Sequence, residues 1–352
     1  MSKLLIVDFL YVEAHRVMNI NLIQCFAENN QVTVLDLNGY YKEQKKCWEE
    51  KNIKVVSYKV NQIGEGKIKS RFNSLRMMQA ARVQCQNHDY DLMIVLAYDT
   101  MSFAIGRVGF GRVPVAVYHH KNIDELTNRW KLKLFNTYKN KIYHLVFEDY
   151  FQNYLIEKIG VEKSRCYVLP HPVERTIKEA NTSFAGFDCV GLCNSNSETF
   201  IDRTLEMNEK YKQNKLSILL RSKTKKSSKS NVKIITGFLK ADRYYEYIQN
   251  AGVVLVPIPD TYVYRLSGSI YDALSRHKIV LTTSKYYCDD YEKRYPGICI
   301  YVKDELETIE KLCTKIEDDQ TEYSFQKFIE EHSGVYVADK MKKVVDSMIG
   351  DK

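Results

Sequence analysis

A turn of small residues lies where the chain could bind an anion. Ser267-Gly268-Ser269 follows the apolar run Val253–Val256 and opens a predicted helix, and Arg265 stands two residues before the turn. The amino end of a helix carries unpaired N–H groups and a partial positive charge, which stabilise a phosphate. We expect the turn and Arg265 to hold a diphosphate. A plain helix cap is the alternative, because serine is among the preferred capping residues.

Further polar residues follow two other predicted strands. Arg221 and Lys223 come directly after the apolar run 216–220, and Gly191 ends the run 187–191. Ligands of open α/β sheets bind at the carboxyl ends of the strands. We therefore expect Arg221 and Lys223 to offset negative charge on a ligand, and Gly191 to let a ligand approach the backbone closely. An ordinary turn before a helix is the alternative for Gly191.

Two adjacent histidines, His119 and His120, end the apolar run 113–118. By the same rule their imidazoles lie at the ligand-binding edge of a sheet, where they could contact a substrate or transfer a proton. The alternative is a pair of ordinary loop histidines, since neither has metal-ligand partners at a useful spacing.

The sequence predicts neither a metal site nor a cofactor. Asp89 and Asp91 have a spacing that can hold a divalent cation, but they lead straight into the apolar run 92–97, which indicates a structural role at the start of a strand. The nine cysteines show no paired C-x2-C spacing, and Cys189 and Cys193 lack the second pair that a zinc site needs. Reduced thiols of this kind are typical of a cytoplasmic protein.

Strand and helix patterns alternate along the chain. The first series has predicted strands at 4–8, 32–37, 53–58, 92–97, 113–118 and 144–147, with helices at 19–28, 68–86 and 149–159. The second has strands at 187–191, 216–220, 253–256 and 279–281, helices at 200–211 and 244–249, and helices at 309–316, 323–331 and 338–348 near the end. This alternation predicts an α/β protein with parallel sheets. The basic, serine-rich segment 221–233 is predicted to be a solvated loop.

Two prolines, Pro170 and Pro172, interrupt this alternation. A chain of 352 residues exceeds the usual size of one domain. We predict an N-terminal Rossmann-like domain over 1–175, a second over 176–335 and a C-terminal helix in 336–352. No G-x-G-x-x-G motif follows the first strand, which argues against a dinucleotide-dependent dehydrogenase.

Residues 232–284 also show a recognisable order of elements. A strand ends at Gly237-Phe238, a helix follows, the next strand ends at Pro257, and Tyr264 and Asp272 precede the last strand. This order resembles the donor-binding half of GT-B glycosyltransferases of the large retaining group, which use nucleotide sugars and carry an E-x7-E motif. Asp272 falls on the second glutamate of the motif, and Tyr264 falls on the first, where it cannot serve as a carboxylate. The resemblance implies two Rossmann-like domains facing each other across a cleft, with the last helix crossing back to the first.

The resemblance implies roles for donor-binding residues. Gly237 and Phe238 would contact the base, and Asp272 would accept hydrogen bonds from the ribose. The alternatives are a loop glycine with a core phenylalanine, and an acidic residue that complements a helix dipole. His120 would contact the transferred sugar or the acceptor, or His119 would if the register differs by one.

The resemblance further implies a metal-independent transfer of a sugar from a nucleotide-diphosphate donor to a hydroxyl of a glycan or lipid-linked acceptor. Arg221 first and Lys223 second would stabilise the leaving diphosphate. Because Tyr264 replaces a family carboxylate, the stereochemical course cannot be carried over, and an inverting enzyme would need a base such as Glu13, His15 or His120. A nucleotide-sugar 2-epimerase and a non-catalytic nucleotide- or glycan-binding protein are the alternatives. The analogy points to assembly of a bacterial surface polysaccharide.

The net charge of +8 indicates an anionic partner. No nucleic-acid-binding module is recognisable, so nucleic acid is not expected. Residues 129–141 alternate cationic and bulky apolar side chains in a helical context, which suits the surface of an anionic membrane, although a core-facing helix with solvated lysines is the alternative. No export signal and no apolar span of about 20 residues is visible. We expect a cytoplasmic location, with contacts to the inner face of the membrane.

Overall fold

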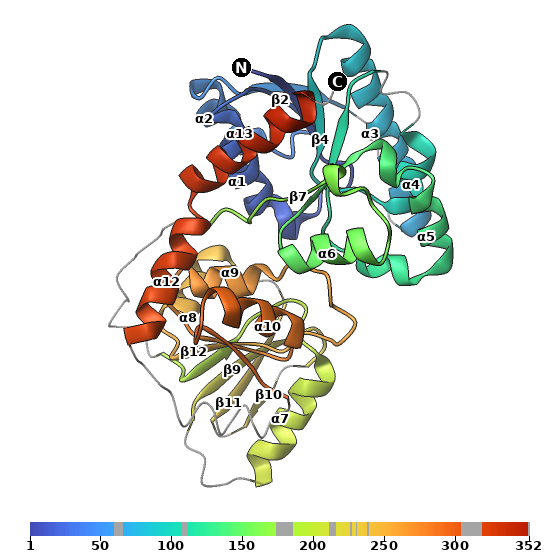
Figure 1. Cartoon of the computed structure of the whole chain (residues 1–352). Helices are drawn as coiled ribbons and strands as arrows, with labels where there is room; N and C mark the ends of the chain where they lie inside the picture. Colours follow the sequence, from blue (N-terminus) through green and yellow to red (C-terminus); the bar gives the residue numbers. More distant parts are fainter. Residues whose placement is uncertain are drawn as a thin grey trace. The chain divides into compact units, whose positions relative to one another are not determined.

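The computed structural model describes residues 1–59, 66–107, 112–173, 186–210, 216–225, 227–229, 231–237, 239–303 and 319–350 (Figure 1). The chain divides into two compact units. The first unit comprises Met1–Pro172 with Gly334–Lys352, and the second comprises Val173–Ser333. Within the described residues, each unit is built on one seven-stranded sheet.

The sheet of the first unit is parallel throughout. Its strands are β1 (Lys3–Val7), β2 (Gln31–Leu37), β3 (Lys54–Tyr58), β4 (Leu92–Val95), β5 (Val115–Tyr118), β6 (Tyr143–Val146) and β7 (Cys166–Val168). They lie in the order β3-β2-β1-β4-β5-β6-β7, with every neighbouring pair parallel. The strand order reverses between β1 and β4. In open α/β sheets, ligands bind outside the carboxyl ends of the strands at this point.

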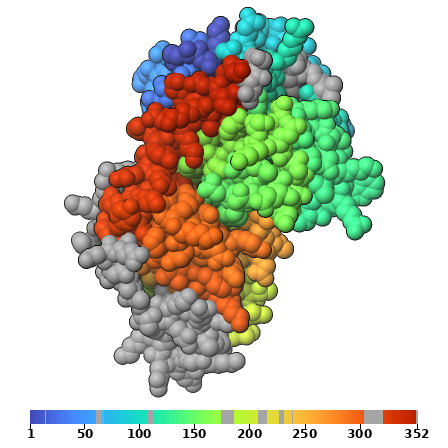
Figure 2. Space-filling view, in the orientation of Figure 1, coloured from blue at the N-terminus to red at the C-terminus, as the bar shows by residue number. Residues whose placement is uncertain are grey.

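Helices connect these strands, and the last helix of the chain joins them. The helical elements are η1 (Glu13–His15), α1 (Arg16–Ala27), η2 (Lys42–Gln44), α2 (Lys45–Glu50), α3 (Lys67–Asn87), α4 (Thr100–Gly106), η3 (Asp124–Thr127), α5 (Arg129–Asn136), η4 (Lys139–Lys141), α6 (Asp149–Glu157), η5 (Lys163–Arg165) and α13 (Gly334–Gly350). Helix α13 packs beside α1, and its backbone accepts hydrogen bonds from Asn29 Nδ2 at Ala338 and from Tyr143 Oη at Met348 (Figures 1 and 2). Its side chains Val337, Met341 and Val345 are buried.

The second unit has a sheet of the same kind with one antiparallel edge. Its strands are β8 (Cys189–Gly191), β9 (Ile218–Ser222), β10 (Ser227–Lys229), β11 (Val232–Thr236), β12 (Val253–Val256), β13 (Val280–Thr282) and β14 (Cys299–Tyr301), in the order β10-β11-β9-β8-β12-β13-β14. The prediction that 221–233 is one solvated loop was wrong. Strand β9 continues to Ser222, and β10 pairs antiparallel with β11. An edge strand needs only backbone pairing, so a lysine- and serine-rich sequence can form one.

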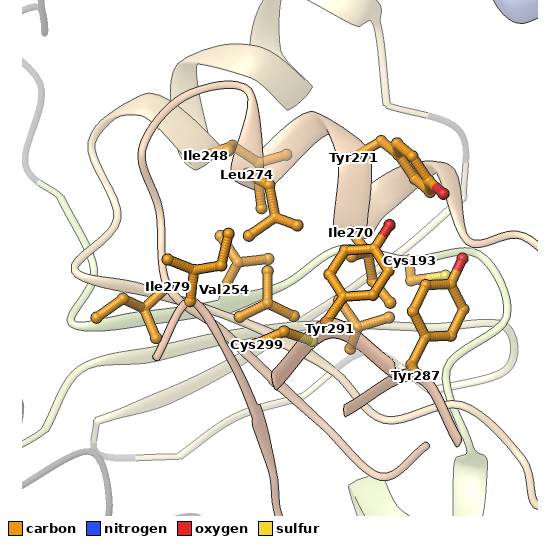
Figure 3. Packing of buried hydrophobic residues seen from close by; sticks show 14 of the residues in the cluster. Cys193, Ile248, Val254, Ile270, Tyr271, Leu274, Ile279, Tyr287, Tyr291 and Cys299 are labelled. Carbon is orange, nitrogen blue, oxygen red and sulfur yellow. The ribbon is translucent and has the colours of Figure 1, made fainter. Parts of the chain in front are cut away.

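Two layers of helix side chains cover the two faces of this sheet. The helices are α7 (Glu198–Lys210), α8 (Ala241–Gln249), α9 (Gly268–Leu274), α10 (Lys285–Arg294) and α12 (Asp319–Glu331). Alternate strand residues such as Val190 and Val254 pack with side chains of α8, α9, α10 and α12. Figure 3 shows Val254 together with Ile248 of α8 and Ile270 of α9. Their neighbours Cys189 and Val253 pack with Phe200 and Ile201 of α7 on the other face. This alternation is the pattern of a doubly wound sheet.

The prediction of two Rossmann-like α/β domains is therefore confirmed. The helix predicted at 309–316 lies outside the described residues. Among the described residues, no helix combines the length and the apolar character that a membrane span requires.

Candidate functional site

In the second unit, the strand order reverses between β8 and β12, and Gly191 ends β8. A Cβ atom at Gly191 would lie 2.8 Å from Leu220 Cδ2 and 3.1 Å from the carbonyl oxygen of Leu255. The absent side chain thus faces neighbouring strands of its own sheet. Close packing inside the sheet is sufficient to explain a glycine at this position.

A pair of glycine substitutions tests this interpretation. We expect Gly191→Ala to destabilise the second unit by about 1–3 kcal/mol, because the added methyl group overpacks a buried position. The matched control is Gly268→Ala, where an added Cβ meets nothing within 4 Å. Thermal unfolding followed by far-UV circular dichroism measures both. Equal melting temperatures for the two variants would contradict the packing argument.

The turn that begins α9 is open to solvent on one side. Ser267 is buried, and its backbone N–H donates to Tyr287 Oη at 3.3 Å, whereas Gly268 is exposed. The Ser267 hydroxyl makes no capping hydrogen bond to the helix. Ser267 therefore occupies the N-cap position of α9, as the alternative interpretation expects, but without the side-chain hydrogen bond of a serine cap.

Three side chains from α8 and α9 meet just inside this turn. Tyr244 Oη lies 3.0 Å from Ser269 Oγ and 3.0 Å from Asp272 Oδ2. Burial raises the pKa of the Asp272 carboxyl to about 6, and the Tyr244 hydroxyl and the Arg276 guanidinium act in the opposite direction. Tyr244 thus holds one oxygen of the carboxylate predicted to meet a ribose. Sequence reasoning missed Tyr244, because its spacing from Asp272 belongs to no motif.

The other predicted donor-binding residues lie in nearby loops. The Arg265 guanidinium carbon lies 3.9 Å from the centre of the Tyr262 ring, the distance of a cation–π contact. The ring centroids of Tyr264 and Tyr286 lie 6.5 Å apart. Gly237 has a φ of +86° and open space where a side chain would be. Phe238 lies outside the described residues.

The loop after β9 is organised by two residues of the segment after β8. Asn196 Nδ2 donates to the carbonyl oxygens of Gly191 and Arg221, at 2.8 and 3.0 Å. Glu198 accepts hydrogen bonds from the Lys223 amide and the Ser222 hydroxyl, each at 2.7 Å. Within the described part of the chain, no hydrogen bond or ion pair of the Arg221 guanidinium is found. Asn196 and Glu198 thus fix the backbone of this loop through hydrogen bonds.

In the first unit, His120 lies at the point where the strand order reverses. Its Nε2 lies 2.7 Å from the carbonyl oxygen of Leu96, just after β4, and its ring stacks on His15 with 4.3 Å between centroids. A carbonyl can only accept, so Nε2 carries the proton and Nδ1 carries the lone pair. Burial, with the nearby His15 and His171, holds the pKa of His120 well below its usual value. The ring is therefore neutral, and 8% of the residue is exposed.

The neighbouring His119 is in a different environment. It has no exposed surface, and its two ring nitrogens lie 3.3 Å from Tyr98 Oη and 2.8 Å from His144 Nδ1. Both hydrogen-bonding positions are thus used inside the unit. Of the two histidines, His120 is the one whose ring can meet a ligand in this structure.

Of the pair Asp89 and Asp91, the structure shows a contact of Asp91 at the end of a strand. Asp91 Oδ2 accepts a hydrogen bond from the Lys3 amide at 2.9 Å, which places the carboxylate at the amino end of β1. In the described ranges, no group of three or more histidine, cysteine or carboxylate side chains could hold a metal ion.

Helix α5 has one buried and one exposed apolar side. Phe135 is fully buried, whereas Trp130 is 75% exposed. Lys133 Nζ lies 5.8 Å from the centre of the Trp130 ring, and Lys131 forms an ion pair with Glu125 at 2.9 Å. Arg129, Trp130 and Lys133 form an exposed cationic and aromatic patch, which we name the α5 surface.

Solved structures with two such units share this architecture over their whole length. HepE of Anabaena, in complex with UDP-glucose, superimposes with a TM-score of 0.69 at 13% identity, covering 99% of this chain and 100% of that chain. Sucrose-phosphate synthase of Thermosynechococcus elongatus gives 0.72 at 11% identity, covering 100% of both chains. The chain has the GT-B fold.

A third similar structure is named as an epimerase and not as a transferase or a synthase. UDP-N-acetylglucosamine 2-epimerase of Rickettsia bellii gives a TM-score of 0.62 at 10% identity, covering 100% of this chain and 98% of that chain. No protein-family model matches this GT-B chain, and no curated protein matches it in sequence. At these identities the likeness shows the fold, and function must be argued from the residues.

Proposed function

We propose that this protein is a glycosyltransferase that moves a sugar from a nucleotide-diphosphate donor to a hydroxyl of a glycan or lipid-linked acceptor. The observation that carries the proposal is the set of cationic side chains, Arg221, Lys223 and Arg265, that lie at or beyond the carboxyl ends of strands β9 and β12 of the second unit. The GT-B fold, shared with HepE in complex with UDP-glucose, agrees with it. The residues at the carboxyl ends of the strands support the proposal. They supply cationic side chains in the second unit and the neutral imidazole of His120 in the first. Assembly of a bacterial surface polysaccharide is the setting that we propose.

The second unit would bind the donor. Arg265 and the amides at Gly268 would receive the diphosphate, and Asp272 would accept hydrogen bonds from the ribose with the oxygen that Tyr244 leaves unused. Arg221 and Lys223 would stabilise the charge that develops on the leaving diphosphate. Because these cationic side chains can fulfil that role, we expect turnover to persist after divalent metal is chelated.

The first unit would bind the acceptor and, in the inverting course that we propose, supply the base. His120 presents a neutral Nδ1 whose lone pair can accept the proton of an attacking hydroxyl. Its Nε2 is held by Leu96, so the ring cannot rotate without losing that hydrogen bond. An exposed carboxylate, Glu13, lies in the same segment as His15 and forms an ion pair with Arg16 at 3.6 Å. We choose His120 over Glu13 because its Nε2–H···O bond to Leu96 fixes the ring and leaves the Nδ1 lone pair as its acceptor.

Incubation with UDP-, GDP- and dTDP-sugars, with and without chelator, tests the proposal. Thermal stabilisation by one class of donor, with slow release of nucleoside diphosphate in the presence of chelator, is the expected result. Stabilisation without any turnover, even with a panel of glycan and polyprenyl-linked acceptors, would favour the non-catalytic binding protein. No stabilisation by any donor would refute the proposal.

A 2-epimerase is the second candidate, because a GT-B neighbour has that activity. Inversion at C2 requires the C2–H bond to break, so an epimerase in heavy water incorporates deuterium at C2 of the recovered donor without any acceptor. A transferase leaves that hydrogen in place. Proton NMR of the nucleotide sugar after incubation separates the two activities.

We also propose that the α5 surface contacts an anionic membrane. Each lysine near such a surface contributes about 1 kcal/mol, so Lys133→Ala should weaken binding to phosphatidylserine vesicles about fivefold. Lys46→Ala is the matched control, since Lys46 is an exposed lysine on α2. Co-sedimentation at low and high salt measures both. Equal losses for the two variants would show that binding depends on net charge alone.

A further inference from the structure

A row of hydrogen-bonded side chains crosses the interior of the first unit beside His120. Tyr98 Oη lies 3.3 Å from His119 Nδ1, His119 Nε2 lies 2.8 Å from His144 Nδ1, and His144 Nε2 lies 2.6 Å from the carbonyl oxygen of Lys139. His119 and His144 have no exposed surface. Buried polar groups cost free energy unless each is paired, and here each member of the row is paired. The proposed reaction makes no direct use of these groups.

The row can run in only one direction. The Lys139 carbonyl can only accept, so His144 donates from Nε2 and, when neutral, accepts at Nδ1. His119 must then donate from Nε2 and accept at Nδ1, which leaves the Tyr98 hydroxyl as the donor. The geometry therefore fixes the tautomer of both rings.

The row also fixes the segment that carries His120. His120 follows His119 directly, and its Nε2 donates to Leu96, which lies two residues before Tyr98. Asn122 Nδ2 donates to the Tyr98 carbonyl oxygen at 3.0 Å and to Thr100 Oγ1 at 3.2 Å. The side chains of His119, His120 and Asn122, which follow β5, are thus hydrogen-bonded to residues 96–100, which follow β4. Tyr98 contributes its hydroxyl and its carbonyl oxygen to these hydrogen bonds.

We propose that the Tyr98 hydroxyl is a positioning group for His120. It acts through His119 and through the segment 119–122, which is joined by side-chain hydrogen bonds to residues 96–100. The Lys139 carbonyl sets the tautomer of His119 through His144, and proton donation by Tyr98 then satisfies His119 Nδ1. The complete row holds the backbone of residues 119 and 120 in place. His120 Nδ1 consequently keeps a fixed direction. The catalytic consequence rests on the proposed transferase function, because His120 would be the base of that reaction.

Two tyrosine-to-phenylalanine variants test the proposal. Tyr98→Phe removes only the hydroxyl that begins the row. The matched control is Tyr118→Phe on β5, whose buried hydroxyl has no hydrogen-bond partner among the described residues. We expect Tyr98→Phe to lower kcat roughly 10-fold to 100-fold with the KM for the donor unchanged, because small displacements of a catalytic group carry penalties of this size. Tyr118→Phe should leave kcat within about twofold of the native value.

Nitrogen NMR of ¹⁵N-histidine-labelled protein gives a readout that does not depend on turnover. The native protein should show His119 and His144 as neutral Nε2–H tautomers, and Tyr98→Phe, but not Tyr118→Phe, should shift the His120 ring nitrogens. Nδ1–H tautomers, or His120 signals that are the same in the two variants, would overturn the proposal. So would a loss of activity in Tyr98→Phe that matches the loss of folded protein. A native protein that shows the expected nitrogen signals but transfers no sugar would refute only the transferase function.

Discussion

Lowering the pH from 7 to 5 is expected to destabilise the first unit by several kcal/mol. Burial lowers the pKa of His144 to about 4 from an ordinary value of 6.5, so its neutral form is favoured in the folded state. The contribution of neutral His144 to the free energy of unfolding is fully present above pH 6.5 and is lost as the pH falls toward 4. At pH 5 the loss is about 2 kcal/mol for His144 alone. The pKa values of His119 and His120 are lowered by burial as well, which adds losses of the same sign.

Two described carboxyls of the same unit, Asp8 and Asp36, act in the opposite direction, since burial raises the pKa of each. Burial raises the pKa of Asp8 to about 6, although the amides of Leu10 and Tyr11 donate to it. Protonation of Asp8 therefore favours the folded state as the pH falls from 7 to 5, by about 1 kcal/mol. Burial also lowers the pKa of His15 and of His171 to about 4, so five histidines oppose two carboxyls and the net effect of acid is destabilising.

Tryptophan fluorescence measures this effect in the first unit alone. Both tryptophans of the chain, Trp48 and Trp130, belong to it, and Trp48 is fully buried. Urea unfolding at pH 7 and pH 5 should give free energies that differ by at least 3 kcal/mol. His144→Gln should be less stable at pH 7 but less sensitive to pH, whereas His88→Asn should behave like the native protein, since His88 is exposed. A difference below about 1 kcal/mol in the native protein would contradict the argument.

The sequence predicts the fold of this protein better than the details of its site. Runs such as Val253–Val256 are apolar on both faces, and in a chain of alternating strands and helices such a run is typical of a parallel strand covered on both sides. Strand β10 could not be found in this way, because Ser227–Lys229 pairs through its backbone at a sheet edge. Side-chain patterns carry no information about such pairing.

The site shows a second limit of prediction from sequence. His119 and His120 are equivalent in sequence, but successive side chains at a strand end point to opposite sides. One ring therefore enters the core beside His144, and the other meets Leu96. At Gly191 the sequence suggests approach of a ligand, and only the structure shows that Leu220 and Leu255 also leave no room for a side chain. In each case a tertiary neighbour that no local pattern indicates decides the role.

Replacing His120 is expected to lower kcat by roughly 10²–10⁴-fold, the usual contribution of a positioned general base. His120→Ala removes Nδ1 and leaves the predicted donor-binding residues of the second unit unchanged, so the affinity for the donor should stay within about twofold. Steady-state kinetics with saturating donor, together with donor titration by calorimetry, separates the two effects. His88→Asn is the matched control. A His120→Ala variant that keeps kcat within about threefold would show that another group accepts the proton.

The pH profile adds a second test of the same assignment. A base is active when it has lost its proton, and burial holds the pKa of His120 well below the ordinary value of 6.5. Activity per folded molecule should therefore not fall near pH 6.5, as it would for an exposed histidine. The folded fraction at each pH follows from the tryptophan signal of Trp48, because the histidines that lower the stability in acid lie in the same unit. A fall of kcat/KM centred near pH 6.5 after this correction would assign the proton transfer to a group with an ordinary histidine pKa and would exclude His120 as the base.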